Sequence, residues 1–261
     1  MNVSEKIMRA KADYDSVLDK GYQDGRVYGY GLGKTDGIEE GKSLGEREWQ
    51  EKYQKEGRNN KAGYYICAYA GWGWTNETFN PAWDIVPSNA SNMFNYSHIT
   101  GNISKLCQEK GVRLDFSKCA GFQSTFVNSA ITGVDTVDTR SCTDLSTIFY
   151  AAGSMVEIND LILKDDGSQT FGRQSFLNCK NLVTLKITGV IAGSGIDLSS
   201  STLLSAESLR YILAALSKDP ALASGKKIIF PTTAEEKTAA DEELSNSLAA
   251  AIAAGWNISY A

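Results

Sequence analysis

The sequence predicts an α/β protein. We expect a short solenoid of parallel strands that ends in an α/β cap and follows a helical stalk. Three observations predict this arrangement. Glycine recurs every four residues between positions 21 and 45, aromatic residues replace charged ones near position 60, and an aromatic-centred unit repeats beyond position 89. The predicted segments are a stalk at 1–58, an aromatic capping segment at 59–88, repeats at 89–200 and a C-terminal cap at 201–261.

The N-terminal segment is defined by its glycines, which repeat with a strict spacing of four residues: Gly21, Gly25, Gly29, Gly33, Gly37, Gly41 and Gly45. In a helix these glycines form a row without side chains that rotates gradually around the helix axis. Another helix can pack closely against such a row. Each glycine costs about 1 kcal/mol relative to alanine, so such a helix needs partners of the same kind to persist. The segment is therefore either an oligomeric stalk, with a trimer as one such state, or a flexible linker. We favour the stalk.

Aromatic residues crowd the segment that follows, and four of them are candidates for a ligand-facing platform: Tyr69, Trp72, Trp74 and Trp83. Tyrosine and tryptophan rings stack on sugars and bases, but they also form the first packed layer over an exposed end. Pro81 and Pro87 favour an irregular capping segment, which agrees with the packed layer.

Three rows beyond position 89 align on one phenylalanine each, at spacings of 23 and 27 residues. A small residue follows three positions later, and apolar residues continue at intervals of about three: Phe126, Ser129, Ile131, Val134, Val137; Phe149, Ala152, Met155, Ile158, Leu161; Phe176, Cys179, Leu182, Leu185, Ile187. A fainter row begins at Met93, Phe94, Ser97 and Ile99. A unit this short cannot bury its own apolar face, so neighbouring units must stack. We expect one strand per unit, at 160–163 and 184–187 in the last two rows.

The C-terminal segment predicts two helices and two strands that cover the last repeat. Ser205 is suited to N-cap a helix with Leu209, Ile212, Leu213 and Leu216 on one face, ending near Asp219 and Pro220. A strand is expected at 227–230. Thr233 with Glu236 predicts a capping box for a second helix carrying Leu244, Leu248 and Ile252. Gly255 ends this helix, and a last strand follows at 256–260.

The rows F-x-N-S-x-I, F-Y-A-A and F-L-N-C-K-N-L-V-T-L-K-I, at Phe126, Phe149 and Phe176, resemble BspA-type leucine-rich repeats. Similarity to a group of phage and prophage leucine-rich-repeat proteins of gut Firmicutes extends from Trp72 onward. It rests on a W-T-N-E-T-F-N-P-x-W-D-I-V-P-like element at 74–87, D-F-S-K-C at 115–119, L-S-A-E-S-L at 204–209 and G-W-N-I at 255–258. The row at Phe149 departs from the pattern because it lacks the Asn and the Cys. The resemblance implies a virion or tail-associated role in receptor recognition or structure.

Composition and charge exclude several classes of protein. The formal net charge of −5 provides no basic field for nucleic acid, and no apolar run reaches the length of a membrane span. The polar stretch 1–20 has no signal-peptide core, so we expect synthesis in a bacterial cytoplasm. The resemblance adds a virion location, or an extracellular one after release.

Catalytic chemistry is limited by a single imidazole, His98. Any histidine-activated nucleophile would need it, whereas a surface histidine without function is the simpler interpretation. The five cysteines, at positions 67, 107, 119, 142 and 179, lack C-x-x-C spacing and are interpreted as buried reduced thiols. The glycine-rich 29–34 belongs to the period-four repeat and is no phosphate loop. We therefore expect no cofactor and no metal.

The sequence thus predicts a non-enzymatic interaction protein. An oligomeric stalk would carry a repeat head that recognises a host surface receptor, a glycan or another partner. The alternative is a structural or decorating component of a phage particle that docks on tail proteins without binding a receptor. A small hydrolase built on His98 is the third interpretation.

Overall fold

The computed structural model describes residues 74–81, 84–172, 174–192 and 196–261. The chain divides into the units Met1–Gly63 and Tyr64–Ala261, and every described residue belongs to the second unit. The glycine repeat and three of the four candidate aromatics, Tyr69, Trp72 and Trp83, lie outside the described residues, as does Cys67. The described part confirms the predicted α/β class, because it combines helices with two all-parallel sheets.

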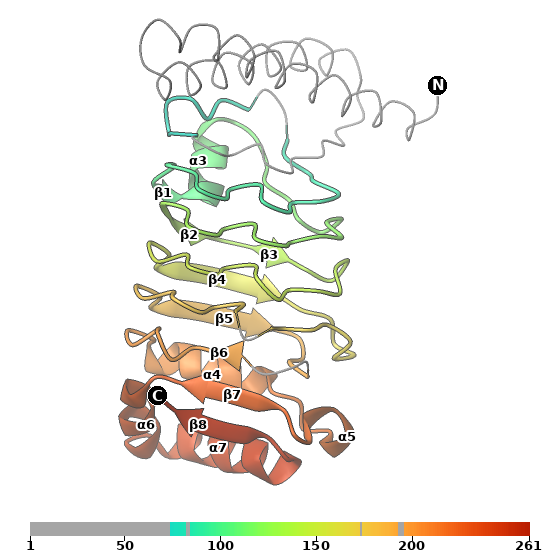
Figure 1. Ribbon diagram of the computed structural model, residues 1–261, viewed down its shortest axis with the longest axis vertical. Helices are drawn as coiled ribbons and strands as arrows, with labels where there is room; N and C mark the ends of the chain where they lie inside the picture. The colour runs from blue at the N-terminus through green and yellow to red at the C-terminus, as the bar shows by residue number, and fades with distance from the viewer. Residues whose placement is uncertain (1–73, 82–83, 173, 193–195) are drawn as a thin grey trace, which may run out of the picture. The chain divides into compact units, whose positions relative to one another are not determined.

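The first sheet is built from strands that successive turns of the chain lay one above the next (Figure 1). It contains β1 (Gly101–Asn102), β2 (Ile131–Val134), β3 (Val137–Asp138), β4 (Glu157–Ile162) and β5 (Thr184–Thr188). β2 lies between β1 and β4, and β4 also pairs with β3 and β5. Each turn therefore supplies one level of this parallel sheet. Helix α3 (Ile103–Glu109) follows β1 directly and was not predicted.

The phenylalanines of the rows form a continuous stack through the interior. Ring centroids lie 5.5 Å apart between Phe94 and Phe126, 5.0 Å between Phe126 and Phe149, and 5.5 Å between Phe149 and Phe176. All four rings are fully buried and nearly parallel. The fainter row that begins at Met93 therefore continues the same stack.

A small residue follows each phenylalanine three positions later, and each is buried: Ser97, Ser129, Ala152 and Cys179. The Cys179 thiol donates to the Phe149 carbonyl oxygen of the level above, at 3.1 Å. Burial raises the pKa of Cys179 to about 12, so the thiol stays protonated. The four described cysteines are free and buried, as predicted.

One further row was not predicted, because leucine replaces the phenylalanine. Leu198, Ser201 and Leu204 are buried at the spacing of Phe176, Cys179 and Leu182. The Ser201 hydroxyl donates to the Cys179 carbonyl oxygen at 3.1 Å, which continues the column of small residues by one level.

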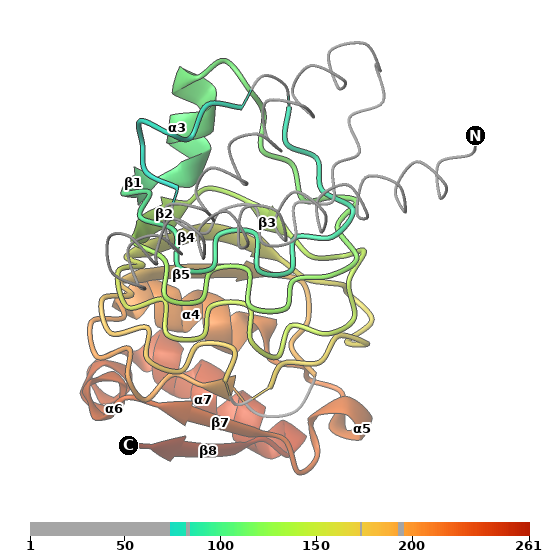
Figure 2. The same ribbon diagram turned by 45° about the horizontal axis from the view of Figure 1, so that its top comes forward.

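The C-terminal part holds the second sheet, formed by the parallel strands β6 (Ile196–Asp197), β7 (Lys227–Phe230) and β8 (Asn257–Tyr260). Its helices are α4 (Ala206–Ala215), α5 (Pro220–Ala223), α6 (Thr232–Ala239) and α7 (Glu242–Ala254). Figure 2 shows α7 behind β7 and β8. The predicted cap Ser205, the strand at 227–230 and the left-handed Gly255 after α7 are confirmed.

The prediction of one helix opened by Thr233 and running past Leu248 is wrong, since the chain forms α6 and α7 there. The Thr233 hydroxyl donates to the Thr202 carbonyl oxygen at 2.9 Å and caps no helix. The Asp241 carboxylate accepts from the Leu244 N–H at 3.0 Å and starts α7. Ile252, expected on the buried face, is 54% exposed.

Strand and helix boundaries differ at four other places, and one of them is the last strand, expected at 256–260, which begins at Asn257. The strand expected at 160–163 runs from Glu157 to Ile162, and the one expected at 184–187 extends to Thr188. The helix opened by Ser205 ends at Ala215, and Pro220 instead begins the short α5, with Asp219 as its N-cap. Proline is well suited to the first position of a helix, where its missing N–H costs nothing.

Helix α4 takes the place of a strand at the edge of β5. The Ser208 hydroxyl accepts from the Leu185 N–H at 3.0 Å and donates to the Val183 carbonyl oxygen at 2.9 Å. One side chain therefore satisfies an edge donor and an edge acceptor, and it places the outer face of α4 beside the outer face of β5.

A left-handed residue follows each stacked phenylalanine by two positions: Tyr96, Asn128, Ala151 and Asn178 have φ between 50° and 68°. Asparagine tolerates this conformation and alanine does not. We expect Ala151→Asn to raise the free energy of unfolding by up to about 1 kcal/mol, or Tm by about 2–4 °C. Thermal unfolding measures the change. Ala152→Asn is the matched control and should destabilise, because position 152 is fully buried. A lower Tm for Ala151→Asn would contradict this account.

Candidate functional site

The outer face of the first sheet carries a row of polar side chains that form two clusters. Inward residues of the strands, such as Ile158, Leu161 and Leu185, are fully buried, whereas the residues between them are partly or fully exposed. We call the outer row the polar strip. It consists of Asn102, Asp135, Glu157, Asn159, Asp160, Lys186, Thr188 and, from α4, Tyr211.

The upper part of the polar strip is joined by amide groups. The Asn102 Nδ2 amide donates to Asp135 Oδ1 and to Glu157 Oε1, both at 2.8 Å. Asn159 Nδ2 donates to the same Asp135 oxygen at 3.1 Å. Lys105 Nζ lies 3.6 Å from Glu157 Oε1. Residues from β1, from β4, from the turn between β2 and β3, and from α3 are therefore fixed relative to one another by short contacts.

Gly133 makes this cluster possible. It pairs with Asn102 on one side and with Glu157 on the other. A Cβ at position 133 would lie 2.6 Å from Glu157 Cγ and 3.0 Å from Asn102 Nδ2. The Asn102 amide reaches Glu157 only because no side chain stands between them.

The lower part of the polar strip centres on Asp160. Its Oδ1 atom accepts from the Thr188 hydroxyl at 2.7 Å and lies 3.9 Å from Lys186 Nζ. Lys186 Nζ also lies 5.9 Å from the ring centroid of Tyr211, within the range of a cation–π contact. The Tyr211 hydroxyl donates to Glu207 Oε1 at 3.0 Å, and this carboxylate raises the pKa of Tyr211.

The strip offers carboxylates, amides, an ammonium group, hydroxyls and one aromatic ring on a rigid support. Planar amide and carboxylate groups beside an aromatic ring suit hydroxyl-rich or extended polar ligands, which need several hydrogen bonds and one apolar contact. The side chains of Glu157, Asp160 and Lys186 are 27–39% exposed, so they remain accessible to a ligand.

Of the predicted aromatic candidates, Trp74 alone lies in the described part. Its ring is partly buried and packs on Phe79 at 5.3 Å and on Phe94 at 6.4 Å between centroids. This packing agrees with a first packed layer over the stack. The His98 side chain is exposed, and the His98 backbone N–H donates to the Trp74 carbonyl oxygen at 2.7 Å.

Sequence reasoning missed the polar strip, although a signal was present. Polar residues alternate with the inward apolar positions, as in Leu185, Lys186 and Ile187. If the polar residues that face outward on the predicted strands had been compared, Lys186 and Asp160 would have been found. It would not have found Asn102 or Tyr211, which lie outside the predicted strands.

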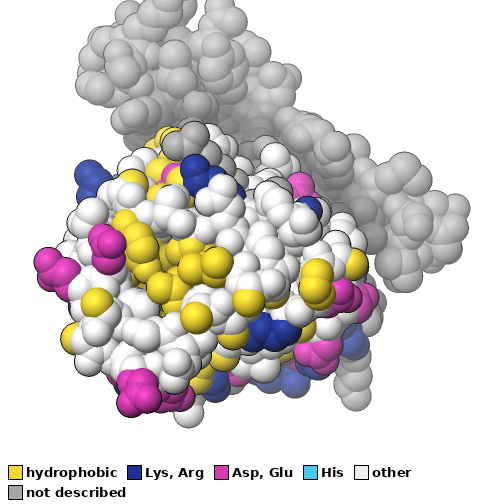
Figure 3. Space-filling view, turned by 90° about the horizontal axis from the view of Figure 1, so that it is seen from below, with side chains coloured by type: hydrophobic (Ala, Val, Ile, Leu, Met, Phe, Trp, Pro, Cys, Tyr) yellow, Lys and Arg dark blue, Asp and Glu magenta, His cyan; other side chains and the backbone are white. Residues whose placement is uncertain are grey.

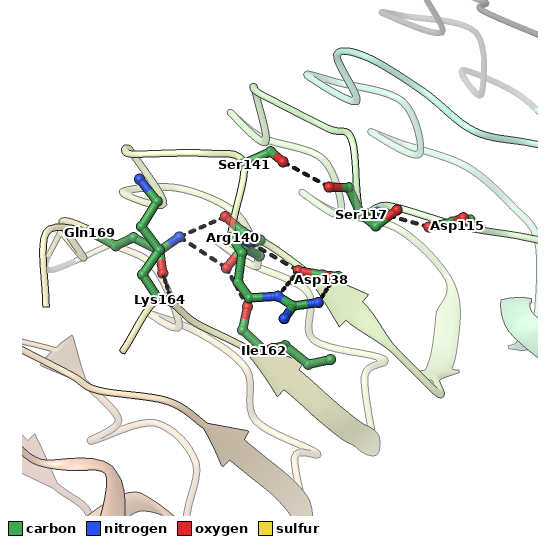
Figure 4. Close-up of polar contacts among 9 residues, drawn as sticks. Asp115, Ser117, Asp138, Arg140, Ser141, Ile162, Lys164 and Gln169 are labelled. Atoms are coloured by element: carbon green, nitrogen blue, oxygen red, sulfur yellow. Dashed lines mark hydrogen bonds and ion pairs between the residues drawn. The ribbon is translucent and has the colours of Figure 1, made fainter. Parts of the chain in front are cut away.

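A second polar network lies at the corner where the strands end (Figure 4) and is structural. Gln169 is buried, and its Nε2 amide donates to the carbonyl oxygens of Thr139 and Cys142 at 2.7 and 3.0 Å. Its Oε1 atom accepts from the Lys164 N–H at 2.6 Å. Gln169 thus ties two levels of the stack together. At the same corner, Arg140 Nε and Nη2 donate to the Asp138 carboxylate at 3.0 and 2.7 Å.

Comparisons with known proteins add no assignment: no family model, no curated protein and no solved structure matches the chain. Among the described residues, no group of three or more histidine, cysteine or acidic side chains is placed to hold a metal ion. In the same part of the chain, no helix is both long and apolar enough to cross a bilayer.

The Gln169 network yields a stability prediction. Gln169→Leu removes the partners of two carbonyl groups and one N–H in the interior, and we expect the free energy of unfolding to fall by about 3 kcal/mol. Denaturant unfolding measures the loss. Gln123→Leu is the matched control, because Gln123 is exposed, and its effect should stay within about 0.5 kcal/mol. Equal effects of the two substitutions would show that the Gln169 bonds contribute no stability.

The Asp138–Arg140 pair predicts a pH dependence. The hydrogen bonds from Arg140 hold the pKa of Asp138 below its ordinary value. The folded-state pKa is thus lower than the unfolded one, so this stabilisation is complete above about pH 5 and lost as pH falls through the folded-state value. We expect Arg140→Gln to have a lower Tm than the natural protein at pH 7 and a much smaller difference near pH 2. A difference that does not change with pH would disprove the linkage.

Proposed function

We propose that the chain is a non-enzymatic recognition protein, in which a leucine-rich-repeat-like solenoid head binds a host surface through the polar strip. The observation that carries this proposal is the gathering of polar side chains in the strip. They come from β1, β4, β5, the turn between β2 and β3, and α4, separated by up to about a hundred residues of sequence, yet they lie on one outward face.

Support for the solenoid comes from the repeated rows. Stacked phenylalanines, a column of small residues and a parallel strand ladder recur at every level from Phe94 to Phe176. The stacked rings and paired strands hold the surface of the sheet rigid, so little conformational entropy is lost when a ligand binds to it.

A glycan is the ligand class that the strip fits best. Sugars present hydroxyl groups that both donate and accept, and the strip offers carboxylate acceptors and the Lys186 ammonium donor. The partly exposed Tyr211 supplies a ring for the apolar face of a sugar. If the stalk joins several heads, as the glycine repeat predicts, weak single contacts would add up by avidity.

The second candidate function is a structural or decorating role on a phage particle, with docking on tail proteins and no receptor. The resemblance of 74–81 and the repeat rows to phage and prophage proteins favours it as much as it favours recognition. Both functions fit a virion location, and binding to cells distinguishes them.

The recognition proposal predicts that one charge reversal on the strip abolishes binding. Labelled full-length chain is measured on candidate host cells and on an array of bacterial surface glycans. Lys186→Glu places a carboxylate beside Asp160 and removes the cation from Tyr211, so we expect affinity to fall at least about 10-fold, the equivalent of 1.4 kcal/mol.

Lys180→Glu is the matched control, because it changes the net charge equally at an exposed site before β5. It should bind as the natural protein does. Absent or unsaturable binding by the natural protein would favour the decorating role. Saturable binding that both variants retain would place the recognition surface elsewhere on the molecule.

A further inference from the structure

The C-terminal end of the stack has an open strand edge. Within the described residues, β8 pairs with β7 alone and forms one edge of the second sheet. The N–H groups of Asn257 and Ala261 donate to Lys226 and Phe230 of the β7 side. Because backbone direction alternates along a strand, the N–H and C=O groups of Ile258 and Tyr260 point to the open side.

This edge is short, at four residues, but it lacks three other usual protections against pairing: charge, proline and a bulge. Natural edge strands carry charges, proline or bulges. The stretch 244–261 contains no charged residue and no proline, although 22% of the chain is charged. The register between β7 and β8 runs without a bulge over four residue pairs.

The helix beside the edge is also uncovered. Figure 3 views the molecule from this end and shows hydrophobic side chains gathered on it. Ile252 is 54% exposed, and Ala249, Ala250 and Ala253 of α7 are exposed as well. Ile258 and Tyr260 lie half-buried at the end of the core. The end of the stack therefore presents two layers, an unpaired strand and an apolar helix face.

We propose that a second copy of this chain docks here, with β8 pairing antiparallel to β8 of the other copy. A two-fold axis perpendicular to the second sheet brings the two β8 strands side by side and also brings the two α7 helices side by side. Strand β8 then contacts β8 of the other copy, and α7 contacts α7 of the other copy. The two-fold symmetry limits this interface to two copies.

The uncharged edge favours a copy over an unrelated partner. The stretch 244–261 contains no charged side chain, so β8 itself adds no repulsion between two identical surfaces; the acidic group that acts on this strand is the Glu235 carboxylate of α6, beside Tyr260. The exposed alanines of α7 also let the two helices approach closely without long side chains between them. A continuous sheet β6–β7–β8 across both copies would satisfy the free backbone groups. The inference does not depend on the proposed recognition of a host surface.

The proposed axis passes beside Ser259. Its N–H and C=O point toward β7, so Ser259 would face its symmetry mate as a non-hydrogen-bonded pair with Cα atoms about 4.5 Å apart. This distance suits a disulfide. We expect Ser259→Cys to form a covalent dimer when oxidised with copper phenanthroline, read on a non-reducing gel. Gln123→Cys, exposed at another level of the stack, should stay monomeric on the same gel.

Charge supplies the second measurement. Ser259→Lys places two like charges opposite each other across the axis, whereas Gln123→Lys adds the same charge elsewhere. Light scattering on the full chain should give the Ser259→Lys variant half the mass of the natural protein and of Gln123→Lys. If the stalk also joins copies, docking between heads of different stalks adds mass to the natural protein, so the Ser259→Lys variant should still have the lower mass.

Two results would each overturn the proposal: equal masses for the natural protein and a folded Ser259→Lys variant, or no covalent dimer with Ser259→Cys. Circular dichroism shows whether the lysine variant is folded. If it is not folded, the cysteine result alone decides, since cysteine for serine changes the volume of the side chain little.

Discussion

The stacking of one phenylalanine on the next is the contact on which the rest of the molecule depends. Each level of the stack is too short to bury its own apolar face, and its Phe ring is covered by the ring above and the ring below. The parallel ladder on one wall and the small-residue column on the other follow from this spacing. The first and last rings of the stack have a ring on one side only, so other residues must cover them. Trp74 and Phe79 lie at the Phe94 end, and Leu198 lies at the level that follows Phe176.

Much of this arrangement could be predicted from the sequence because the periodic signal is large and local. Phe126, Phe149 and Phe176 are chemically distinct from their neighbours, and the residue three positions later is small every time. Capping chemistry is equally local, which explains why Ser205 and Gly255 were found. The row at Leu198 was missed because leucine is too common to mark a period by itself.

The predictions that failed depended on contacts distant in sequence. Thr233 has the composition of a helix cap, but its hydroxyl is engaged by Thr202, 31 residues away. The polar strip depends on such contacts throughout, since Asn102 meets Glu157 across 55 residues and over a glycine. Alternation in a strand indicates which side chains face outward, but stacking decides which levels are neighbours. Sequence reasoning could therefore predict the support of the site better than the site itself.

The two sheets end differently at the C-terminal end of the stack. This difference relates the polar strip to the proposed pairing of β8 strands. On the wall of the first sheet, α4 closes the edge of β5 through Ser208. The second sheet, formed by β6, β7 and β8, instead ends at the open edge of β8. A rotation about an axis perpendicular to the sheet keeps each wall on its own side. Two copies joined through β8 would therefore present both polar strips in the same direction, and a repetitive surface could engage them together.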